Sequence, residues 1–534
     1  MSYFTRIGSV VNSQTFNRLH FTIIGKLFRE NFCKLCIVVL DSDYWTNLAS
    51  KELEEALNVK WNEGIAKNII LFIGDGMGPN TVTATRIHKG GESHRLSYEM
   101  FPHVGLLKTY SADKMVPDSA ATATALLCGE KANQNTVGVS SSVPHRDCAA
   151  SLKNFHFKNG IPGFVTTMRV THATPGPVYA HSAARQWECD SSVPAGSEQC
   201  KDIARQLFED FPGRDLNVIM GGGRQGLVAN ASGTPGDPTS TWGCSRADGR
   251  DLIQEYRNNK QSRGLKYSVV SNNRELQNLN VNETDYLLGI FSNAHLAYDN
   301  ERNTGPEGMP SITDMVDAAI KVLKKNPKGF FLMVEGGNID MAHHRGRAKL
   351  AVNEASAMEQ AVQVALALTD DHDTLLVVTS DHTHTMSING YPDRGANIFG
   401  THLVGPSRFD GLNYTTISYG TGGPGSFQYS IETNETGAPH IVRQNPTAEE
   451  TDSFTYEQIA AVPLDENSHG GGDVIVYARG PYAHLFHNIH EQHYVFHVLS
   501  YAAKIGPYSA GNNVQCSVAI LSFGLLSLIL FRQY

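Results

Sequence analysis

The segment Asn68-Ile69-Ile70-Leu71-Phe72-Ile73-Gly74-Asp75-Gly76-Met77-Gly78 places an acidic residue directly after a continuous apolar run. The segment Thr374-Leu375-Leu376-Val377-Val378-Thr379-Ser380-Asp381-His382 has the same form. Such runs are typical of strands that are buried on both faces of a parallel sheet. A core does not tolerate an unpaired aspartate, and the carboxyl ends of these strands are where ligands bind. We therefore expect Asp75, Asp381 and His382 to meet at one sheet edge and hold a metal.

Other apolar segments alternate with helix-like segments along the chain. The expected buried strands are residues 160–167, 216–220 and 330–335. The expected helices are residues 50–57, 119–127 and one that runs from Asp340 through His344 to about Leu368. This alternation predicts an α/β fold with a doubly wound, mostly parallel central sheet flanked by helices. Residues 390–467 are rich in glycine, proline, threonine and asparagine, which predicts an inserted, irregular, β-containing subdomain.

The bulk composition excludes one class of function. The chain has 534 residues, 41% of them hydrophobic, which suffices for one large core or two ordinary domains. Its net charge is −9 and it has no basic stripe, so nucleic-acid binding is not expected.

Two further patterns invite a functional interpretation that the sequence does not favour. Residues 221–226 satisfy the dinucleotide-binding pattern G-x-G-x-x-G, but Pro235 and Pro238 follow where its helix should run. Five histidines have helix-like spacing, and only Glu491 offers them a carboxylate partner nearby. Packing or surface roles are therefore favoured over a metal stripe for His484, His487, His490, His493 and His497.

Sequons and the C-terminus indicate an extracellular protein. The four N-glycosylation sequons are at Asn230, Asn282, Asn413 and Asn434. Small residues at 509–511, a polar spacer and the apolar residues 518–531 form the pattern of a glycosylphosphatidylinositol (GPI) anchor signal. The alternative is a single-pass anchor helix, but this run is short for the ~20 residues that span a bilayer. Residues 509–534 are therefore assigned to the anchor signal.

The N-terminus is a less regular targeting segment. Residues 32–40 are apolar but interrupted by Lys34, and they begin later than the apolar part of a usual secretory signal. Residues 1–42 are therefore treated as a signal or an uncertain extension, and residues 43–508 as the main domain.

Further polar residues near strand ends suit metal binding, namely Thr174, Glu335, Asp340, His344 and His469. Asp340 and His344 are four residues apart and share one helix face. Mixed carboxylate and imidazole ligands suit zinc, whereas carboxylate and hydroxyl oxygens suit magnesium.

Ser119 lies at the start of a predicted helix, where the backbone N–H groups and the helix dipole favour an anion. It can be a simple helix cap. A metal beside it would instead lower the pKa of its hydroxyl and make it a nucleophile. Arg185 is a candidate for holding a tetrahedral oxyanion, because a guanidinium pairs with two phosphate oxygens at once.

Four motifs together resemble animal alkaline phosphatases, in particular membrane-bound enzymes of the insect type. These are residues 72–78, residues 116–120, residues 334–340 with His343 and His344, and residues 380–384. The similarity extends from about Trp45 to Gly506. It implies that residues 43–508 form a catalytic domain that hydrolyses phosphate monoesters of broad specificity through a phosphoserine. It also implies a homodimer, formed through the inserted segment at 390–467.

The resemblance assigns a role to each matching residue. Ser119 matches the phosphorylated nucleophile, Arg185 the phosphate-holding arginine, and His172 a residue beside the magnesium ligands. The ligands implied for the first zinc are Asp340, His344 and His469. Those implied for the second zinc are Asp75, Ser119, Asp381 and His382. Those implied for magnesium are Thr174, Glu335 and Asp75, which bridges to the second zinc.

The chain also departs from its vertebrate relatives. Met341 follows Asp340 at a position where many of them have a histidine. Near Phe291, Ser292 and Met309 stand where those relatives have calcium ligands, so no calcium site is expected.

The eight cysteines can be sorted with the help of the family. Cys148 and Cys200 match a family disulfide, and Cys128 matches a buried free thiol. Cys189 and Cys244 are then left to pair by elimination.

Two alternative functions are compatible with a related fold. A sulfatase-like hydrolase needs a cysteine or serine in a C-x-P-x-R-like context, but Ala-Ala-Thr follows Ser119. A non-catalytic, GPI-anchored surface glycoprotein or receptor would have lost site residues, but every matched ligand and the nucleophile are intact here.

Overall fold

The computed structural model describes residues 42–142, 161–197, 199–401, 406–408, 410–427, 429–433 and 436–509. The predicted N-terminal signal and the apolar C-terminal tail lie outside these residues. Contacts divide the chain into a first unit, which ends at Lys60, and a second unit, which begins at Trp61. Helix α2 (Ser42–Leu57) belongs to the first unit. It begins at Ser42 and not at Ser50, because residues 42–49 contain no glycine or proline that would stop a helix.

A ten-stranded sheet forms the centre of the second unit. In spatial order its strands are β17 (Asn488–Glu491), β2 (His103–Lys108), β16 (Val474–Arg479), β8 (Thr374–Ser380), β1 (Asn68–Gly74), β7 (Phe330–Gly336), β3 (Ile161–Arg169), β4 (Val218–Gly222), β6 (Tyr286–Ile290) and β5 (Tyr267–Val270). Only β16 runs antiparallel to its neighbours β2 and β8. The prediction of a mostly parallel sheet is therefore confirmed.

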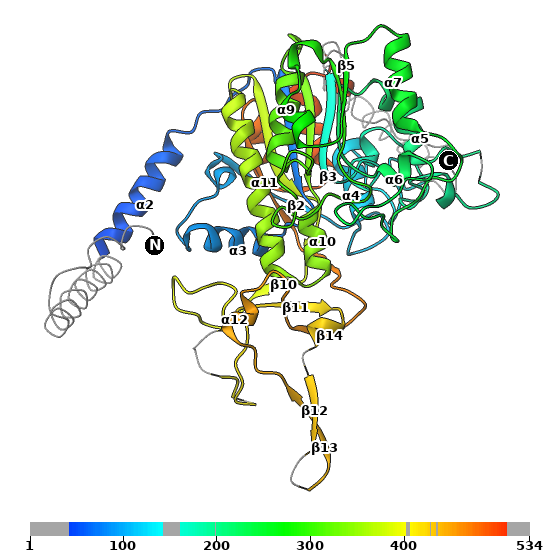
Figure 1. The fold of residues 1–534 in the computed structure, drawn as a ribbon. Coiled ribbons are helices and arrows are strands. Elements are labelled where there is room, and N and C mark those ends of the chain that lie inside the picture. Colours follow the sequence, from blue (N-terminus) through cyan, green and yellow to red (C-terminus); the bar gives the residue numbers. More distant parts are fainter. Residues whose placement is uncertain are drawn as a thin grey trace, which may run out of the picture. The chain divides into compact units, whose positions relative to one another are not determined.

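Both faces of the sheet are covered, which explains the uninterrupted apolar strands. Along β1, Ile69, Leu71 and Ile73 pack into one core cluster, and Ile70 and Phe72 pack into the other. The helices that contribute to the first cluster are α4 (Ser119–Cys128), α5 (Ile203–Glu209), α6 (Arg224–Leu227), α7 (Leu252–Ser262) and α13 (Tyr494–Ala502). Those that contribute to the second are α3 (Pro79–Gly90), α8 (Asn273–Gln277), α9 (Ile312–Leu323), α10 (Asn338–His344) and α11 (Ala348–Leu368). Helices α9 and α11 lie side by side on this face (Figure 1).

The predicted single helix from Asp340 to Leu368 is wrong, because the chain forms α10 and α11 with a break between them. Gly346 has a φ of +67° in this break, a left-handed conformation that glycine adopts without strain. The Gly346 N–H donates to the carbonyl oxygen of His343 at 2.8 Å. The break ends α10 at His344, and α11 begins at Ala348 as a separate helix.

Residues 390–467 form short β-elements, as expected. The elements of this segment are β11 (Ile417–Gly422), β12 (Tyr429–Thr433), β13 (Pro439–Arg443), α12 (Ala448–Thr451) and β14 (Ala460–Pro463). Strand β11 lies between β14 and β10 (Met386–Ile388) in a three-stranded sheet. Strands β12 and β13 pair as a hairpin that projects from this sheet (Figure 1).

Two sequence patterns acquire a structural explanation. The glycine-rich segment 221–226 leads into α6, which is four residues long, so no dinucleotide-binding helix follows it. The five spaced histidines belong to a 3₁₀ turn (Ala483–Phe486), to β17, to α13 and to the links between them, so they share no single helix face. No helix among the described residues has both the length and the apolar character that a membrane crossing requires.

Candidate active site

The predicted site residues converge at the carboxyl ends of adjacent strands. Strands β8, β1, β7 and β3 are consecutive in the sheet and run parallel, so their ends meet at one edge. Asp75 follows β1, Asp381 and His382 follow β8, and Glu335 is the penultimate residue of β7. Thr174 lies in the loop after β3. The parallel arrangement thus brings together residues that are up to 307 positions apart, since Asp75 and His382 both line this edge.

The carboxylates at this edge are buried close to one another. Asp75, Glu335 and Asp381 are each 0% exposed. Burial, followed by repulsion from neighbouring carboxylates, raises the pKa of Asp75 far above its ordinary value and that of Asp381 to about 6. Burial also raises the pKa of Glu335 to about 7, although hydrogen bonds oppose the shift. As ionised groups, these three side chains need a positive charge beside them.

Four buried oxygen atoms at this edge have no hydrogen-bond partner. They are both carboxylate oxygens of Asp75, Oε1 of Glu335 and Oγ1 of Thr174. Thr174 is close to Glu335, but the pair lacks the geometry of a hydrogen bond. The other oxygen of Glu335 accepts a hydrogen bond from Thr166 Oγ1 at 2.5 Å. Unpaired buried oxygens from two carboxylates and a hydroxyl are the donor set that magnesium prefers.

Asp381 is held in place by the backbone around it. Its Oδ1 accepts hydrogen bonds from the N–H groups of Gly76 (3.0 Å) and His382 (2.8 Å), and its Oδ2 accepts one from Thr122 Oγ1 (3.2 Å). Gly76 has a φ of +66°, and a Cβ at this position would lie 2.6 Å from the His384 ring. The glycine after Asp75 therefore permits both the turn and the close packing of the site.

A second group of ligand-type side chains surrounds Asp340. His344 Nε2 lies 3.3 Å from Asp340 Oδ2, as the predicted spacing of one helical turn requires, and His469 Nε2 lies 3.4 Å from Asp340 Oδ1. Although burial opposes it, the adjacent histidines hold the pKa of Asp340 well below its ordinary value. Asp340 is therefore ionised and faces the imidazoles as a carboxylate.

The tautomers of His344 and His469 follow from their backbone contacts. Nδ1 of His344 lies 2.7 Å from the carbonyl oxygen of Asn467, and Nδ1 of His469 lies 2.8 Å from that of Pro117. A carbonyl oxygen only accepts, so each Nδ1 carries the proton. If both rings were neutral, their Nε2 lone pairs would face each other at 3.1 Å. Although burial opposes it, Asp340 raises the pKa of His344 to about 9, so a proton between the two nitrogens, or a cation in its place, satisfies them.

His384 is a member of this group that the sequence interpretation missed. Its Nε2 lies 2.5 Å from Asp340 Oδ1, and its Nδ1 lies 2.6 Å from Asn467 Oδ1. The side chains of Asp340, His382, His384 and His469 could hold a metal ion together, and so could those of Asp75, Asp381 and His382. His384 enters the site because β9 (Thr383–His384) pairs with β15 (His469–Gly470), which places His384 opposite His469.

Ser119 is the first residue of α4, and Asp118 caps this helix by accepting from the Ala121 N–H at 3.3 Å. The Ser119 side chain is therefore not the cap. Its Oγ lies 3.2 Å from His382 Nε2, which belongs to the cluster. The positive end of the α4 dipole and the side chains that could bind a metal are thus both close to this hydroxyl group.

Arg185 reaches the same site and is oriented from two sides. Its Nη1 donates to Asp118 Oδ2 at 3.0 Å, and its Nη2 donates to His172 Nε2 at 3.2 Å. Burial, and then the nearby Arg185, keep the pKa of His172 well below its ordinary value, so its ring is neutral and can accept. Asp118, which the sequence interpretation treated only as part of a helix start, therefore links the Ser119 helix to Arg185.

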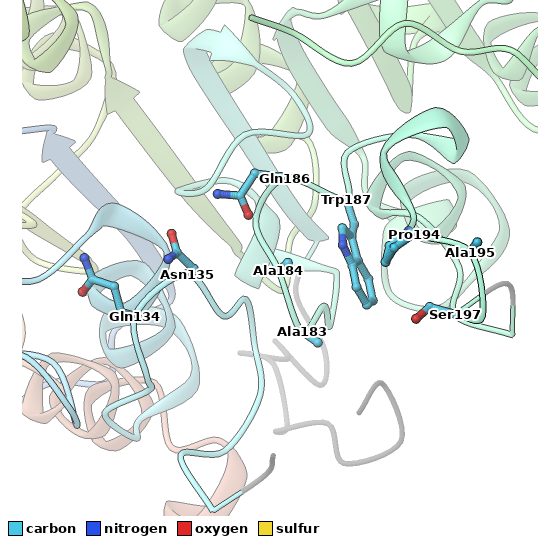
Figure 2. Close-up of a pocket in the computed structure, with 9 residues that line it drawn as sticks. All are labelled: Gln134, Asn135, Ala183, Ala184, Gln186, Trp187, Pro194, Ala195 and Ser197. Atoms are coloured by element: carbon cyan, nitrogen blue, oxygen red, sulfur yellow. The ribbon is translucent and has the colours of Figure 1, made fainter. Parts of the chain in front are cut away.

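A pocket of about 820 Å³ opens onto these residues. Ser119, Arg185, His172 and His469 line it, and so does Met341. A second hollow of about 430 Å³ lies beside it and shares Gln186 with it. Figure 2 shows that Gln134, Asn135 and Gln186 present side-chain amides in this second hollow.

The remaining predicted positions lie outside the site. Cys189 and Cys244 form a disulfide, as expected by elimination, and Cys128 is a free, buried thiol. Cys200 is disulfide-bonded, but Cys148 lies outside the described residues, so their pairing stays a prediction. Of the sequons, Asn230 and Asn282 are exposed and Asn413 is half-buried, whereas Asn434 is not among the described residues. At the predicted non-calcium position, Ser292 and Met309 are buried, and their side chains bond to the backbone at Ala294 and Ala297.

The fold and the site together define a class. A serine at a helix N-terminus, beside buried carboxylates and imidazoles at the carboxyl edge of a parallel sheet, is suited to a metal-dependent hydrolase of anionic esters. An arginine whose guanidinium faces the same pocket suits a phosphoryl group.

Comparison with known proteins specifies the family. The alkaline phosphatase family model matches residues 66–505. The tissue-nonspecific alkaline phosphatase of Gallus gallus is 44% identical over 497 residues, which cover 90% of this chain and 92% of the relative. An alkaline phosphatase of Gadus morhua is 43% identical over 483 residues and covers 87% of this chain and 97% of its own. The chain belongs to the alkaline phosphatase family and is a phosphoric monoester hydrolase.

Solved structures confirm the fold. The alkaline phosphatase of Thermus thermophilus superposes with a TM-score of 0.56 at 23% identity, over 84% of this chain and 93% of that one. That of the Antarctic bacterium TAB5 superposes with a TM-score of 0.55 at 22% identity, over 83% and 99% of the two chains.

The contact between His384 and Asp340 generates a prediction. We expect His384→Ala to weaken metal retention about 10–100-fold, because Asp340 loses the group that orients it. Residual activity, measured while the enzyme is equilibrated with graded zinc in a chelator buffer, gives the affinity. His88→Ala is the control, since His88 packs on Phe399 outside this cluster. Equal zinc titration curves for the His384 variant and the unchanged enzyme would refute the assignment.

Proposed function

We propose that this enzyme hydrolyses a broad range of phosphate monoesters through a phosphoserine at Ser119, at a site that binds two zinc ions and one magnesium ion. The observation that carries the proposal is the position of Ser119. Its Oγ lies at the N-terminus of α4 and 3.2 Å from His382 Nε2, without serving as the helix cap. A buried hydroxyl in this position has the surroundings of a nucleophile.

The donor atoms support the identity of the three ions. Asp340, His344 and His469 offer one carboxylate and two imidazole nitrogens, the mixture that zinc prefers. Asp381, His382 and Ser119, together with Asp75, form a second mixed set. Asp75, Thr174 and Glu335 offer only oxygen atoms, which would suit magnesium. When bound, the ions would neutralise the carboxylates, favour the ionised serine and stabilise negative charge on the leaving oxygen.

The residues of the chain supply the other requirements of the reaction. Arg185 donates two N–H groups to phosphate oxygens and fixes the phosphoryl group over Ser119, while Asp118 and His172 hold the guanidinium. The Ser119 hydroxyl loses its proton to water, its Oγ forms a bond to phosphorus as the bond to the leaving oxygen breaks, and the departing alkoxide takes a proton from water. Water then displaces Ser119 from phosphorus and returns a proton to its oxygen, so two inversions give net retention. Because Arg185 and the bound ions would hold the phosphoryl group and not the alcohol, we expect broad specificity for the alcohol.

Replacement of the nucleophile tests the proposal. We expect Ser119→Ala to abolish the phosphoenzyme and to remove most turnover, because the other hydroxyl in the first turn of α4, that of Thr122, donates to Asp381. Enzyme incubated with labelled phosphate at acid pH and then denatured should carry label only when Ser119 is present. Ser140→Ala, at a serine outside the pocket, is the control. Label retained by the Ser119 variant, or turnover equal to that of the control, would show that the nucleophile is another residue.

We expect Met341 to give a lower affinity for phosphate than a histidine at this position would give. Its thioether lines the pocket but donates no hydrogen bond, whereas a histidine could donate one directly or through water. We expect Met341→His to lower the inhibition constant for phosphate about 2–10-fold, which corresponds to roughly 0.5–1.5 kcal/mol, and to slow turnover where product release limits it. Met341→Leu, which adds no donor, should leave the constant unchanged. Competitive inhibition by phosphate at one pH compares the three enzymes, and equal or weaker binding by the histidine variant would show that Met341 only packs.

We further propose that the protein is a glycosylated enzyme on the outer face of the plasma membrane, held by a GPI anchor as in the membrane-bound, insect-type enzymes. The apolar residues 518–531 and the sequons support this location. Phosphatidylinositol-specific phospholipase should release the activity from intact cells. A mature protein that retains residues 518–531 in mass spectrometry would be incompatible with the anchor.

We also propose a homodimer that uses residues 390–467, and no calcium site. Light scattering from the purified enzyme would measure its mass in solution, and a monomer would refute the dimer. Elemental analysis would detect calcium, and a stoichiometric amount would refute the metal assignment at Ser292 and Met309. The comparisons favour neither the sulfatase-like hydrolase nor the non-catalytic surface glycoprotein, because the relatives named above are alkaline phosphatases.

A further inference from the structure

Trp242 is an exposed side chain that the site description leaves unexplained. Its exposed fraction is 95%, and among the described residues no other large apolar side chain is exposed to a greater extent. The indole therefore gains almost nothing from the folding of this chain. Single exposed apolar residues are common, so exposure alone indicates no function. The position of Trp242 is what separates it from the others, since it borders the same pocket as Ser119 and Arg185.

The loop that carries Trp242 is firmly held. Cys244, two residues away, forms a disulfide with Cys189. The Gln225 side chain is 1% exposed; it accepts from the Ser240 N–H at 2.7 Å and donates to the Ser240 carbonyl oxygen at 3.0 Å. The N–H of Trp242 itself donates to Ser240 Oγ at 3.2 Å. The backbone is thus fixed on both sides of the tryptophan, and a ligand that contacts the ring pays little entropy to order the loop.

The pocket extends beyond what a phosphoryl group needs. Its volume of about 820 Å³ falls within the range of sites for whole small molecules. Ser119 and Arg185 fix where phosphorus lies, so the alcohol of the substrate must occupy the remainder. Tyr298 lines that remainder, with the Arg345 guanidinium 5.4 Å from its ring centre, and Trp242 adds a second aromatic side chain.

We propose that Trp242 is a specificity-determining residue that stacks on planar aromatic leaving groups, such as the base of a nucleoside monophosphate or the ring of an aryl phosphate. This inference rests on the proposed phosphomonoesterase function and names a preferred substrate class for it. An indole face attracts a flat ring through dispersion and offset stacking, and it discriminates little between one ring and another. A small aliphatic alcohol presents no such face. Trp242 thereby favours aromatic monoesters within an otherwise broad specificity.

The mechanism predicts which kinetic constant will change. The leaving group departs when the phosphoserine forms, so the later hydrolysis of phosphoserine and the release of phosphate are common to all substrates. Contacts made by Trp242 therefore affect kcat/KM and KM, whereas kcat stays the same when a later step limits turnover. We expect Trp242→Ala to reduce kcat/KM for adenosine monophosphate and for 4-nitrophenyl phosphate about 3–10-fold. We expect kcat/KM for glycerol 2-phosphate to change by less than about twofold, because this substrate has no ring that could stack on Trp242.

Variants of the full-length, metal-loaded enzyme test this inference. Trp242→Phe keeps a flat ring and should restore most of the loss. Trp61→Ala is the matched control, because Trp61 is 64% exposed, does not line the pocket and lies outside the proposed dimer segment. Trp242 makes few contacts, so the thermal unfolding midpoint of its alanine variant should equal that of the unchanged enzyme.

Each result has a defined meaning. A selective loss of kcat/KM for adenosine monophosphate alone supports stacking on a nucleobase. A selective loss for both aromatic substrates supports stacking on any aromatic ring. An equal loss for glycerol 2-phosphate, or no change for any substrate, overturns it while leaving the phosphatase function intact. Absence of activity on all three substrates in the unchanged enzyme would instead refute the proposed function.

Discussion

The enclosure of several carboxylates at one sheet edge is the constraint on which the rest of the structure depends. Asp75, Glu335 and Asp381 are fully buried, and Asp75 has no hydrogen-bond partner for either oxygen. An isolated ionised carboxylate in a protein interior costs several kcal/mol, so these groups must be protonated or paired with cations. The parallel strands, the turn at Gly76 and the hydrogen bonds to Asp381 all hold these groups where protons or cations must neutralise them.

The same requirement appears in the second half of the site as facing nitrogen lone pairs. Backbone carbonyls take the Nδ1 protons of His344 and His469, which directs both Nε2 atoms toward Asp340. The fold thus favours positive charge at the site in two ways, through unpaired oxygens and through facing nitrogens. The stability that this edge lacks must come from the apolar cores on the two faces of the sheet, which bury β1 from both sides.

Much of this arrangement could be predicted from the sequence, because it depends on local patterns. The apolar strands, their terminal acidic residues and the spacing of Asp340 and His344 are all visible within short segments. His384 was missed because it joins the site through the pairing of β9 with β15, across 85 positions between His384 and His469. The break at Gly346 was missed because a single glycine does not stop a strong helical pattern, and a left-handed φ is not evident from composition. Trp242 lies in a loop without periodicity, and only its position beside the pocket marks it.

The site thus has two parts with different physical requirements. Around Ser119, Arg185 and Asp381 are each fixed by two or more hydrogen bonds, so a substitution there disturbs its neighbours. Around Trp242 the backbone is fixed but the side chain is free, so a substitution changes the contact with the leaving group and little else. Met341 belongs to both parts, since it directly follows the candidate metal ligand Asp340 and also lines the open pocket. Phosphate chemistry and preference for the alcohol can therefore vary independently, because separate structural elements hold the groups responsible for each.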